Sequence, residues 1–537
     1  MDNCEHPLTR RQEIESAAAV TELQRQVKAL KRKKYEALCD RLREISRLKE
    51  VSRVLQWDQS ICLPRGGGEA RGKQLAAVAG IVHEKETSQE VGDLISELME
   101  VSLEGLNDFE RAVVRDAHIE WDRGNRLTKE LAMARIERAN QAAQKWLEAK
   151  EKNDFMIFAP SLQEMVEISK EVAATVAPGT DPYTVMVDEY ERGMTAQRLG
   201  EIFRDIKEFL LALLSNNGEK GISQQRRQRR EIGVSNFSGN YDVEQQEQLC
   251  RKLIDFLGFW PENGRLDVAH AATTYTLSSS DVRLVTKIAS NNFSEALLAT
   301  MHECGHAFYD LGLNKDYQGL PVSKPLSTGM HESQALIWEY LVGKSHEFCT
   351  WFWPMAKEFF PELQTKTADD FYRYLNTVHP SPIRVNADEV TYPLHIILRY
   401  EIERDLFAGT IHADEVPKVW NEKMQDYLGV LPKDDNEGCL QDVHWSYGCF
   451  GYFPAYALGA MYSVQLFEAA QRDVLDLKGY FRDGQFKALL DWLGKNIHSW
   501  GSLFASADLL LEEATGNPLN LQVYKAYLAR KYEESLA

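Results

Sequence analysis

The chain has 537 residues, a hydrophobic content of 44% and a formal net charge of −19 at pH 7. This length allows either two or more domains or one large helical body, and the hydrophobic content supports a sizeable core. The negative charge argues against a general nucleic-acid binder and against a protein that docks on anionic membranes.

The N-terminus and the cysteines indicate a cytoplasmic protein. The first 16 residues are polar and lack the apolar core of a signal peptide, and no run of 18 apolar residues occurs in the sequence. The eight cysteines are scattered and include no CxxC pair, which is typical of reduced thiols. We therefore expect a cytoplasmic location and no membrane span.

Helical periodicity dominates the chain. Apolar residues recur at intervals of three and four in the segments 11–55, 107–153, 162–176, 196–215, 243–257, 457–475 and 484–499. We predict a mainly α-helical protein, in which residues 1–30 form an N-terminal helical extension. Residues 216–240 contain GEKG and RRQRR, and we interpret them as a surface insertion.

The segment 268–288 has a different composition, rich in Thr, Ser and β-branched residues. It predicts one or two short strands joined by a turn near Ser278–Ser280. An exposed strand edge at this place could pair with an extended peptide. The alternative interpretation is a small structural hairpin.

The most informative motif is HExxH at His302-Glu303-Cys304-Gly305-His306, within a predicted helix from Phe293 to Leu311. Residues four apart lie on one helix face, so the two imidazoles can bind one metal ion. Zinc hydrolases combine such a pair with a neighbouring carboxylate that acts as a base, here Glu303. The alternative is a helix with two surface histidines.

A catalytic zinc ion usually takes a third protein ligand. The metzincin pattern is excluded, because Tyr309 and Gly312 stand where it requires Gly and His. HESQ at 331–334 opens a following helix that Ser327 or Thr328 could cap. Glu332 and Glu339 on this helix are the two candidates, and we favour Glu332.

Five short motifs resemble those of a known family, the carboxypeptidase Taq family of metallocarboxypeptidases. They are HECGH at 302–306, HESQ at 331–334, IRVNAD at 383–388, GCLQDVHW at 438–445 and DVRLVT at 281–286. The resemblance runs from about residue 35 to the C-terminus. It implies a peptidase domain at 31–537, in which a deep central groove crosses a large helical body and a small β-element lies near the metal.

The chain departs from the family pattern beside the predicted groove. His270-Ala271-Ala272 stands where the family usually has His-Pro-Phe. Val285 occupies the threonine position of D-x-R-x-T, and Thr286 follows it. Both departures leave the metal ligands unchanged and affect the region expected to contact substrate.

The resemblance implies a peptide substrate with a free C-terminus, one divalent metal ion and a homodimer. Zinc is the first choice for two imidazoles and a carboxylate, and cobalt also fits. Arginine suits a carboxylate because its planar fork bonds both oxygens, so we assign Arg384 to the substrate C-terminus, with Arg283 second. His270 is a further candidate for substrate contact.

Three residues in the aromatic segment after 440 are candidate donors to the oxyanion of the tetrahedral intermediate. They are His444, Tyr452 and Tyr456. Gln441 and Asp442 are interpreted as residues that orient neighbours, including the ligand histidines, and Asp388 as one that orients an arginine or caps a helix.

The leading hypothesis is a carboxypeptidase that releases single amino acids, with His302, His306 and Glu332 on the metal and Glu303 as the base. A second hypothesis is an oligopeptidase or dipeptidyl carboxypeptidase with the same site. A third is a catalytically silent helical scaffold that binds peptides. The intact ligand set and Glu303 favour an enzyme.

Overall fold

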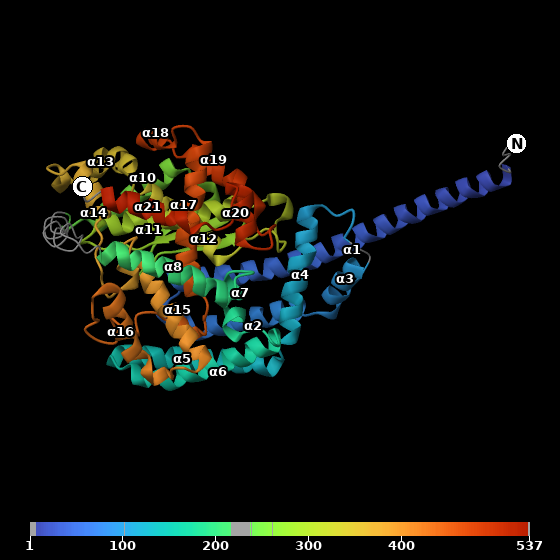
Figure 1. Cartoon of the computed structure of the whole chain (residues 1–537), viewed down its shortest axis with the longest axis horizontal. Coiled ribbons are helices and arrows are strands. Elements are labelled where there is room, and N and C mark those ends of the chain that lie inside the picture. The colour runs from blue at the N-terminus through green and yellow to red at the C-terminus, as the bar shows by residue number, and fades with distance from the viewer. Residues whose placement is uncertain (1–6, 101–102, 216–236, 238, 260, 535–537) are drawn as a thin grey trace. The chain divides into compact units, whose positions relative to one another are not determined.

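The computed structural model describes residues 7–100, 103–215, 237, 239–259 and 261–534 (Figure 1). The chain divides into two compact units. Unit 1 comprises Met1–Gln59, Leu63–Asn125 and Asp316–Ser323. Unit 2 comprises Ser60–Cys62, Arg126–Lys315 and Lys324–Ala537.

Unit 1 is built on one long helix. Its helices are α1 (Pro7–Ile61), α2 (Gly68–Glu86), α3 (Gln89–Glu100) and α4 (Asp108–Arg126). Helix α1 contains no Gly or Pro after Pro7, and it ends just before Pro64 and three successive glycines. The predicted extension at residues 1–30 therefore continues, from Pro7 onward, without a break into the rest of this helix.

Unit 2 carries most of the helices. They are α5 (Lys129–Lys152), α6 (Ala159–Val176), α7 (Pro182–Tyr190), α8 (Ala196–Ser215), α10 (Val243–Leu257), α11 (Phe293–Gly312), α12 (Thr328–Leu336), α13 (His346–Phe359), α14 (Ala368–Leu375), α15 (Tyr392–Ala408), α16 (Val416–Leu428), α17 (Phe453–Asp473), α18 (Leu477–Arg482), α19 (Lys487–Asn496), α20 (Ala507–Thr515) and α21 (Leu521–Glu534). A π-helical turn, Ile337–Val342, continues α12.

One predicted helical segment is divided in the structure. The periodicity of residues 107–153 predicts continuous helix, but α4 ends at Arg126 and α5 begins at Lys129. The side chain of Thr128 accepts a hydrogen bond from the backbone N–H of Leu131 and so caps a new helix. Apolar spacing continues across such a break, which is why periodicity alone misses it.

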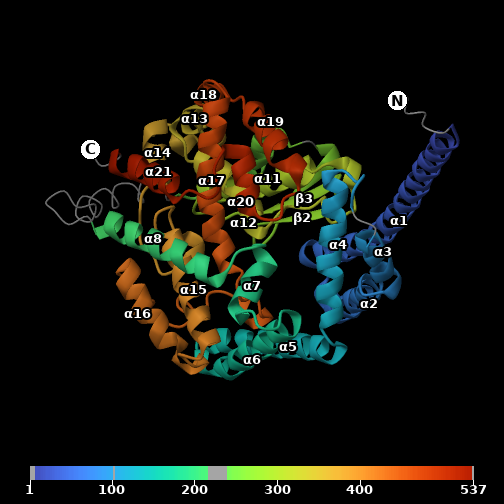
Figure 2. The same ribbon diagram turned by 45° about the vertical axis from the view of Figure 1, so that its right-hand side comes forward.

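A three-stranded sheet lies beside α11. Its strands are β1 (Gly264–Val268), β2 (Thr273–Ser278) and β3 (Asp281–Thr286), in the order β1-β3-β2. The antiparallel pair β2–β3, seen side by side in Figure 2, confirms the strands and the turn predicted around Ser278–Ser280. Strand β1, which pairs in parallel with β3, was not predicted.

Helix α12 lies against both α11 and α17 because glycines permit close packing. A Cβ atom on Gly305 of α11 would lie 2.5 Å from the Cα of Ala335 in α12. A Cβ on Gly459 of α17 would lie 2.8 Å from the Cβ of Glu332. Since Cβ atoms in folded proteins keep larger distances from their neighbours, any side chain at either position would push α12 away.

The mainly α-helical fold with a small β-element is confirmed. In the part of the chain that the structure describes, no helix has both the length and the apolar character needed to cross a bilayer. Apart from residues 237, 239 and 240, the predicted insertion at 216–240 lies outside the described residues. The predicted groove and the boundary at residue 31 stay predictions.

Candidate metal centre

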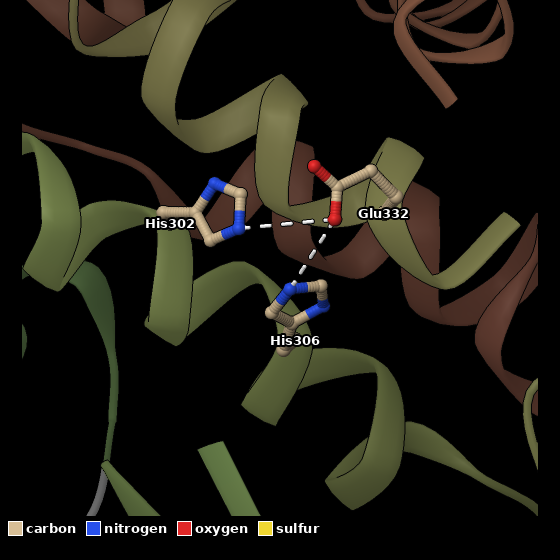
Figure 3. A group of neighbouring side chains, drawn as sticks. All are labelled: His302, His306 and Glu332. Carbon is tan, nitrogen blue, oxygen red and sulfur yellow. Dashed lines mark ion pairs between the residues drawn. The ribbon is translucent and has the colours of Figure 1, made fainter. Parts of the chain in front are cut away.

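Helices α11 and α12 bring His302, His306 and Glu332 together (Figure 3). Oε2 of Glu332 lies 3.9 Å from Nε2 of His302 and 3.7 Å from Nε2 of His306. Two metal–ligand bonds of about 2 Å span at most roughly 4 Å, so both distances allow a shared ion. The three side chains predicted as ligands therefore converge on one point.

The local sequence sets both helices in place. Asn292 caps α11 by accepting a hydrogen bond from the N–H of Ser294, and Ser327 caps α12 by accepting one from Met330. The prediction that Ser327 or Thr328 caps the second helix is thus confirmed, with Ser327 as the cap. Glu332 lies about one turn beyond this start and faces the two histidines (Figure 3).

Glu339, the other candidate for the third ligand, contacts the opposite nitrogen of His302. Its Oε2 lies 2.8 Å from His302 Nδ1, which leaves Nε2 facing Glu332. Burial lowers the pKa of His302, but the charges of Glu332 and Glu339 raise it to about 10. The surroundings therefore favour positive charge at this place, carried either by a proton on the imidazole or by a metal ion that replaces the proton.

The second histidine lies in different surroundings. Burial, together with the neighbouring His331 and His302, holds the pKa of His306 well below its usual value, so this imidazole is neutral and able to bind a metal. The ring of His331 packs 4.2 Å from that of His306, and His331 Nε2 lies 3.5 Å from the carboxylate of Asp310.

Glu303 is buried and held by the sheet. Its Oε2 accepts a hydrogen bond of 2.7 Å from the Thr274 hydroxyl on β2. Two residues further on, Thr276 donates to Asp310, because alternate strand residues face the same side. Burial raises the pKa of Glu303, and the Thr274 hydrogen bond opposes this shift.

The donor set fits a divalent cation. Glu303 and Glu332 are both buried, Glu339 lies on the other side of His302, and the pKa of His306 favours its neutral form. Carboxylates at this density leave negative charge that a dication would neutralise. Two imidazole nitrogens and one carboxylate oxygen are also the ligand types that zinc takes in hydrolases.

Arg384 is buried and bonded to Asp442. Its Nε and Nη2 donate to Asp442 Oδ1 at 3.1 and 2.8 Å. Arg399 donates to Oδ2 at 2.7 Å through Nε, and its Nη2 forms an ion pair with the same oxygen at 2.6 Å. The two arginines hold the pKa of Asp442 well below its usual value, although burial opposes this. One carboxylate therefore fixes two guanidinium groups, and the trio keeps one net positive charge.

The remaining motif residues hold the backbone around Arg384. Gln441 accepts a hydrogen bond of 2.8 Å from the backbone N–H of Arg384 and donates to the carbonyl of Pro382. Asp388 accepts hydrogen bonds from the N–H groups of Val390 and Thr391, which precede α15. Asp388 thus holds the turn before the helix. The cap position of α15 is Thr391, so the interpretation of Asp388 as a helix cap is not confirmed.

Asp442 and Gln441 were predicted to bond to the ligand histidines, but in the structure they bond to other groups. The carboxylate of Asp442 is occupied by Arg384 and Arg399, and Gln441 bonds to backbone groups. Of the histidines, His444 lies 4.0 Å from Asp442. The reason is electrostatic: two guanidinium groups satisfy a buried carboxylate more fully than a neutral imidazole does.

Aromatic residues surround Arg384. The Arg384 guanidinium carbon lies 5.1 Å from the ring centre of Tyr456, and the rings of Tyr452 and His444 are 5.3 Å apart. Burial and then the charge of Glu332 raise the pKa values of Tyr392 and Tyr452. These phenols therefore lie within electrostatic range of the candidate metal ligand.

His444 is predominantly neutral at pH 7. Burial lowers the pKa of His444 to about 4, although the charge of Asp442 opposes this shift. A neutral imidazole keeps one N–H donor, which is the property required of a group that would stabilise an oxyanion.

Arg283 and His270, the other two residues assigned to substrate binding, lie in surroundings that differ from those of Arg384. Arg283 on β3 donates through Nε and Nη2 to Asp281 of the same strand, at 3.0 and 2.9 Å. His270 is exposed in the connection between β1 and β2. Their roles in substrate binding stay predictions.

Two neighbours of the site were missed by the sequence analysis. Thr274 bonds to Glu303, and Tyr392 lies within range of Arg384 and Glu332. The Thr-rich strand before the HExxH helix was a usable signal for Thr274. Tyr392 follows IRVNAD closely in sequence, but its approach to Glu332 depends on tertiary packing.

Comparisons with known proteins give a consistent result. The model of the carboxypeptidase Taq (M32) metallopeptidase family matches residues 37–532. Thermostable carboxypeptidase 1 of Thermus thermophilus is 35% identical, over 93% of this chain and 98% of its own length. Carboxypeptidase 1 of Bacillus subtilis is 33% identical, over 92% and 97%.

Solved structures agree with the sequence comparisons. Trypanosoma cruzi metallocarboxypeptidase 1 superposes with a TM-score of 0.87 at 36% identity, covering 93% of this chain and 99% of that one. The M32 carboxypeptidase from Deinococcus radiodurans R1 gives a TM-score of 0.87 at 29% identity, covering 94% and 99%. The chain therefore belongs to the carboxypeptidase Taq (M32) family and is a metallocarboxypeptidase.

Proposed function

We propose that this enzyme releases single amino acids from the free C-termini of peptides, with one zinc ion held by His302, His306 and Glu332. The observation that carries the proposal is the convergence of these side chains next to the buried carboxylate of Glu303. Cobalt would suit the same ligands. When bound, the metal supplies Lewis acidity, which acidifies water and polarises a peptide carbonyl.

Glu303 is proposed as the general base. Its carboxylate would accept a proton from the attacking water and then donate it to the leaving amine. The Thr274 hydroxyl, 2.7 Å from Oε2, holds this carboxylate in one orientation. His444, Tyr452 and Tyr456 are proposed to donate hydrogen bonds to the oxyanion of the tetrahedral intermediate.

Arg384 is proposed to bind the substrate carboxylate. Its Nε–Nη2 edge already bonds to Asp442, so the edge formed by Nη1 and Nη2 would face the substrate. Arg384, Asp442 and Arg399 together carry one net positive charge in a buried position. A carboxylate would neutralise this charge, whereas an amide would not.

Cleavage of a short peptide with and without a chelator tests the proposed function. We expect one amino acid to be released at each step, no cleavage after chelation, and recovery when zinc is added back. Release of dipeptides would instead support the dipeptidyl carboxypeptidase hypothesis. Cleavage that survives complete removal of the metal would contradict the proposal.

Replacing Glu339 with Ala is expected to weaken zinc binding. The carboxylate fixes the His302 ring through Nδ1, and loss of such a partner typically lowers metal affinity about 10–100-fold. Competition with a chromophoric chelator measures this constant. Glu295→Ala is the matched control, because Glu295 lies in the first turn of α11, the helix that carries His302, and pairs with Lys287 instead of a histidine. Equal affinity in the Glu339 variant and the wild type would show that this contact does not support the metal.

The homodimer and the cytoplasmic location stay predictions. Light scattering coupled to size-exclusion chromatography would test the first of them directly.

A further inference from the structure

Two buried carboxylates outside the reacting groups have similar surroundings. Glu191, immediately after α7, is 1% exposed, and Glu403 on α15 is fully buried. Each accepts three hydrogen bonds, and burial raises the pKa of each to about 7. Burying a carboxylate is costly even when it is hydrogen-bonded, so their positions call for an explanation beyond packing.

Glu191 contacts the beginning of the helix that carries Glu332. Its Oε1 accepts a hydrogen bond of 3.0 Å from the hydroxyl of Ser327, the cap of α12. Its Oε2 accepts one of 3.1 Å from the backbone N–H of Gly329. The positive end of a helix dipole lies here, so a carboxylate stabilises both the position and the start of α12.

The surrounding residues are shaped to admit this carboxylate. A Cβ on Gly329 would lie 2.5 Å from Glu191 Oε2, so a side chain there would displace it. Tyr462 of α17 donates a third hydrogen bond of 3.1 Å to Oε1. Because Glu332 lies about one turn beyond Gly329, a shift of the helix start would move the proposed metal ligand with it.

Glu403 also accepts three hydrogen bonds, two of them from the segment 444–452, which contains the proposed oxyanion donors His444 and Tyr452. It accepts hydrogen bonds from the Trp445 indole at 2.7 Å and from the backbone N–H of Gly451 at 2.8 Å. The third donor is the hydroxyl of Tyr183, at 2.7 Å. Trp445 and Gly451 are the immediate neighbours of His444 and Tyr452, the proposed oxyanion donors.

We propose that Glu191 is a positioning residue for metal binding, which acts through the start of α12, and that Glu403 positions the 444–452 segment and so acts on turnover. The two residues thus support separate parts of one site. This inference rests on the proposed metal ligands and on the proposed role of His444. It predicts that substitution of Glu191 lowers zinc affinity, whereas substitution of Glu403 lowers turnover and leaves zinc affinity nearly unchanged.

Matched variants at the two positions test the proposal. Glu191→Ala is expected to weaken zinc binding at least about tenfold, as loss of a residue that orients a ligand does. Glu403→Ala is expected to keep zinc affinity within about twofold, because its contacts are independent of α12. With zinc saturating, Glu403→Ala should lower kcat/KM roughly 10–100-fold, through displacement of reacting groups.

The Gln variants separate positioning from general loss of structure. Gln keeps the shape of Glu, and its amide can bond to the same hydroxyls and N–H groups after a flip. Glu191→Gln is therefore expected to recover part of the zinc affinity lost in Glu191→Ala. Competition with a chromophoric chelator, with zinc alone as the ligand, measures these constants without reference to activity.

Phenylalanine variants provide a second test if an alanine variant does not fold. Tyr462→Phe and Tyr183→Phe each remove one hydrogen bond, to Glu191 and Glu403 respectively. Tyr462→Phe should weaken zinc binding by about threefold, the effect of one hydrogen bond, whereas Tyr183→Phe should leave zinc binding unchanged.

Three results would decide against the inference. Wild-type zinc affinity in the Glu191 and Tyr462 variants would overturn it and leave the proposed function intact. Equal loss of zinc affinity at both positions would also overturn it, since that pattern indicates a general loss of stability. A wild-type chain that binds no divalent metal would overturn the proposed function, and this inference with it.

Discussion

A Glu303→Gln variant is expected to retain zinc and to lose about 10²–10⁴-fold in kcat, the usual contribution of a general acid–base group. The amide has nearly the same shape and can still accept the hydrogen bond from Thr274, but it cannot accept a proton from water. Zinc should remain because His302, His306 and Glu332 are unchanged. Turnover at saturating peptide, together with metal analysis of the same sample, measures both quantities.

The control for this variant is Thr274→Ser, which keeps the hydroxyl next to Glu303 and is expected to retain most activity. A Glu303→Gln protein that is fully loaded with zinc and turns over at the wild-type rate would assign proton transfer to another residue. A variant that loses zinc as well would indicate that Glu303 supports the metal site, a different role from the one proposed.

Arg384→Ala is expected to abolish most of the preference for peptides with a free C-terminal carboxylate. Removing one partner of a buried charge pair costs about 3 kcal/mol, which is roughly 100-fold in kcat/KM. The measurement compares two peptides that differ only in a C-terminal carboxylate or amide. The free-acid peptide should lose far more than the amidated one, because only the carboxylate can pair with the guanidinium.

Two further variants locate the carboxylate site. Arg384→Lys keeps the charge but loses the planar fork, so an intermediate preference is expected. Arg283→Ala should have little effect, because the Arg283 side chain already bonds to Asp281 within its own strand. Equal losses on both peptides in Arg384→Ala, or a larger loss of preference in Arg283→Ala, would place carboxylate recognition elsewhere.

Local spacing made much of the site predictable from the sequence. The interval of four between His302 and His306 places both imidazoles on one helix face, and Ser327 indicates where the next helix starts. The Glu332 side chain then needs only to point back toward the first helix. By contrast, the contact between Thr274 and Glu303 depends on the packing of a strand against a helix, which periodicity does not encode.

Strand β1 and the contact between Glu191 and Ser327 were not predicted, because periodicity does not encode contacts between segments that are distant in sequence. Strand β1 (Gly264–Val268) has only five residues, and two of them are Gly and Asp, which are rare in strands, so its short alternation of polar and apolar residues is a weak signal. Its pairing with β3 is parallel and depends on the chain returning to the same sheet edge. Likewise, Glu191 and Ser327 are far apart in sequence, and only the folded chain brings them into contact.

Gly305 shows that a residue between the two histidines of HExxH can control how closely the next helix packs. The residue before the second histidine faces the neighbouring helix, and its lack of a side chain sets how near the backbone of Ala335 can come. In other chains with this motif, the size of the residue at this place should therefore indicate where the third ligand originates. A glycine permits a glutamate from a closely packed helix, whereas a bulky residue would require a ligand that reaches the ion from a longer distance or from another direction.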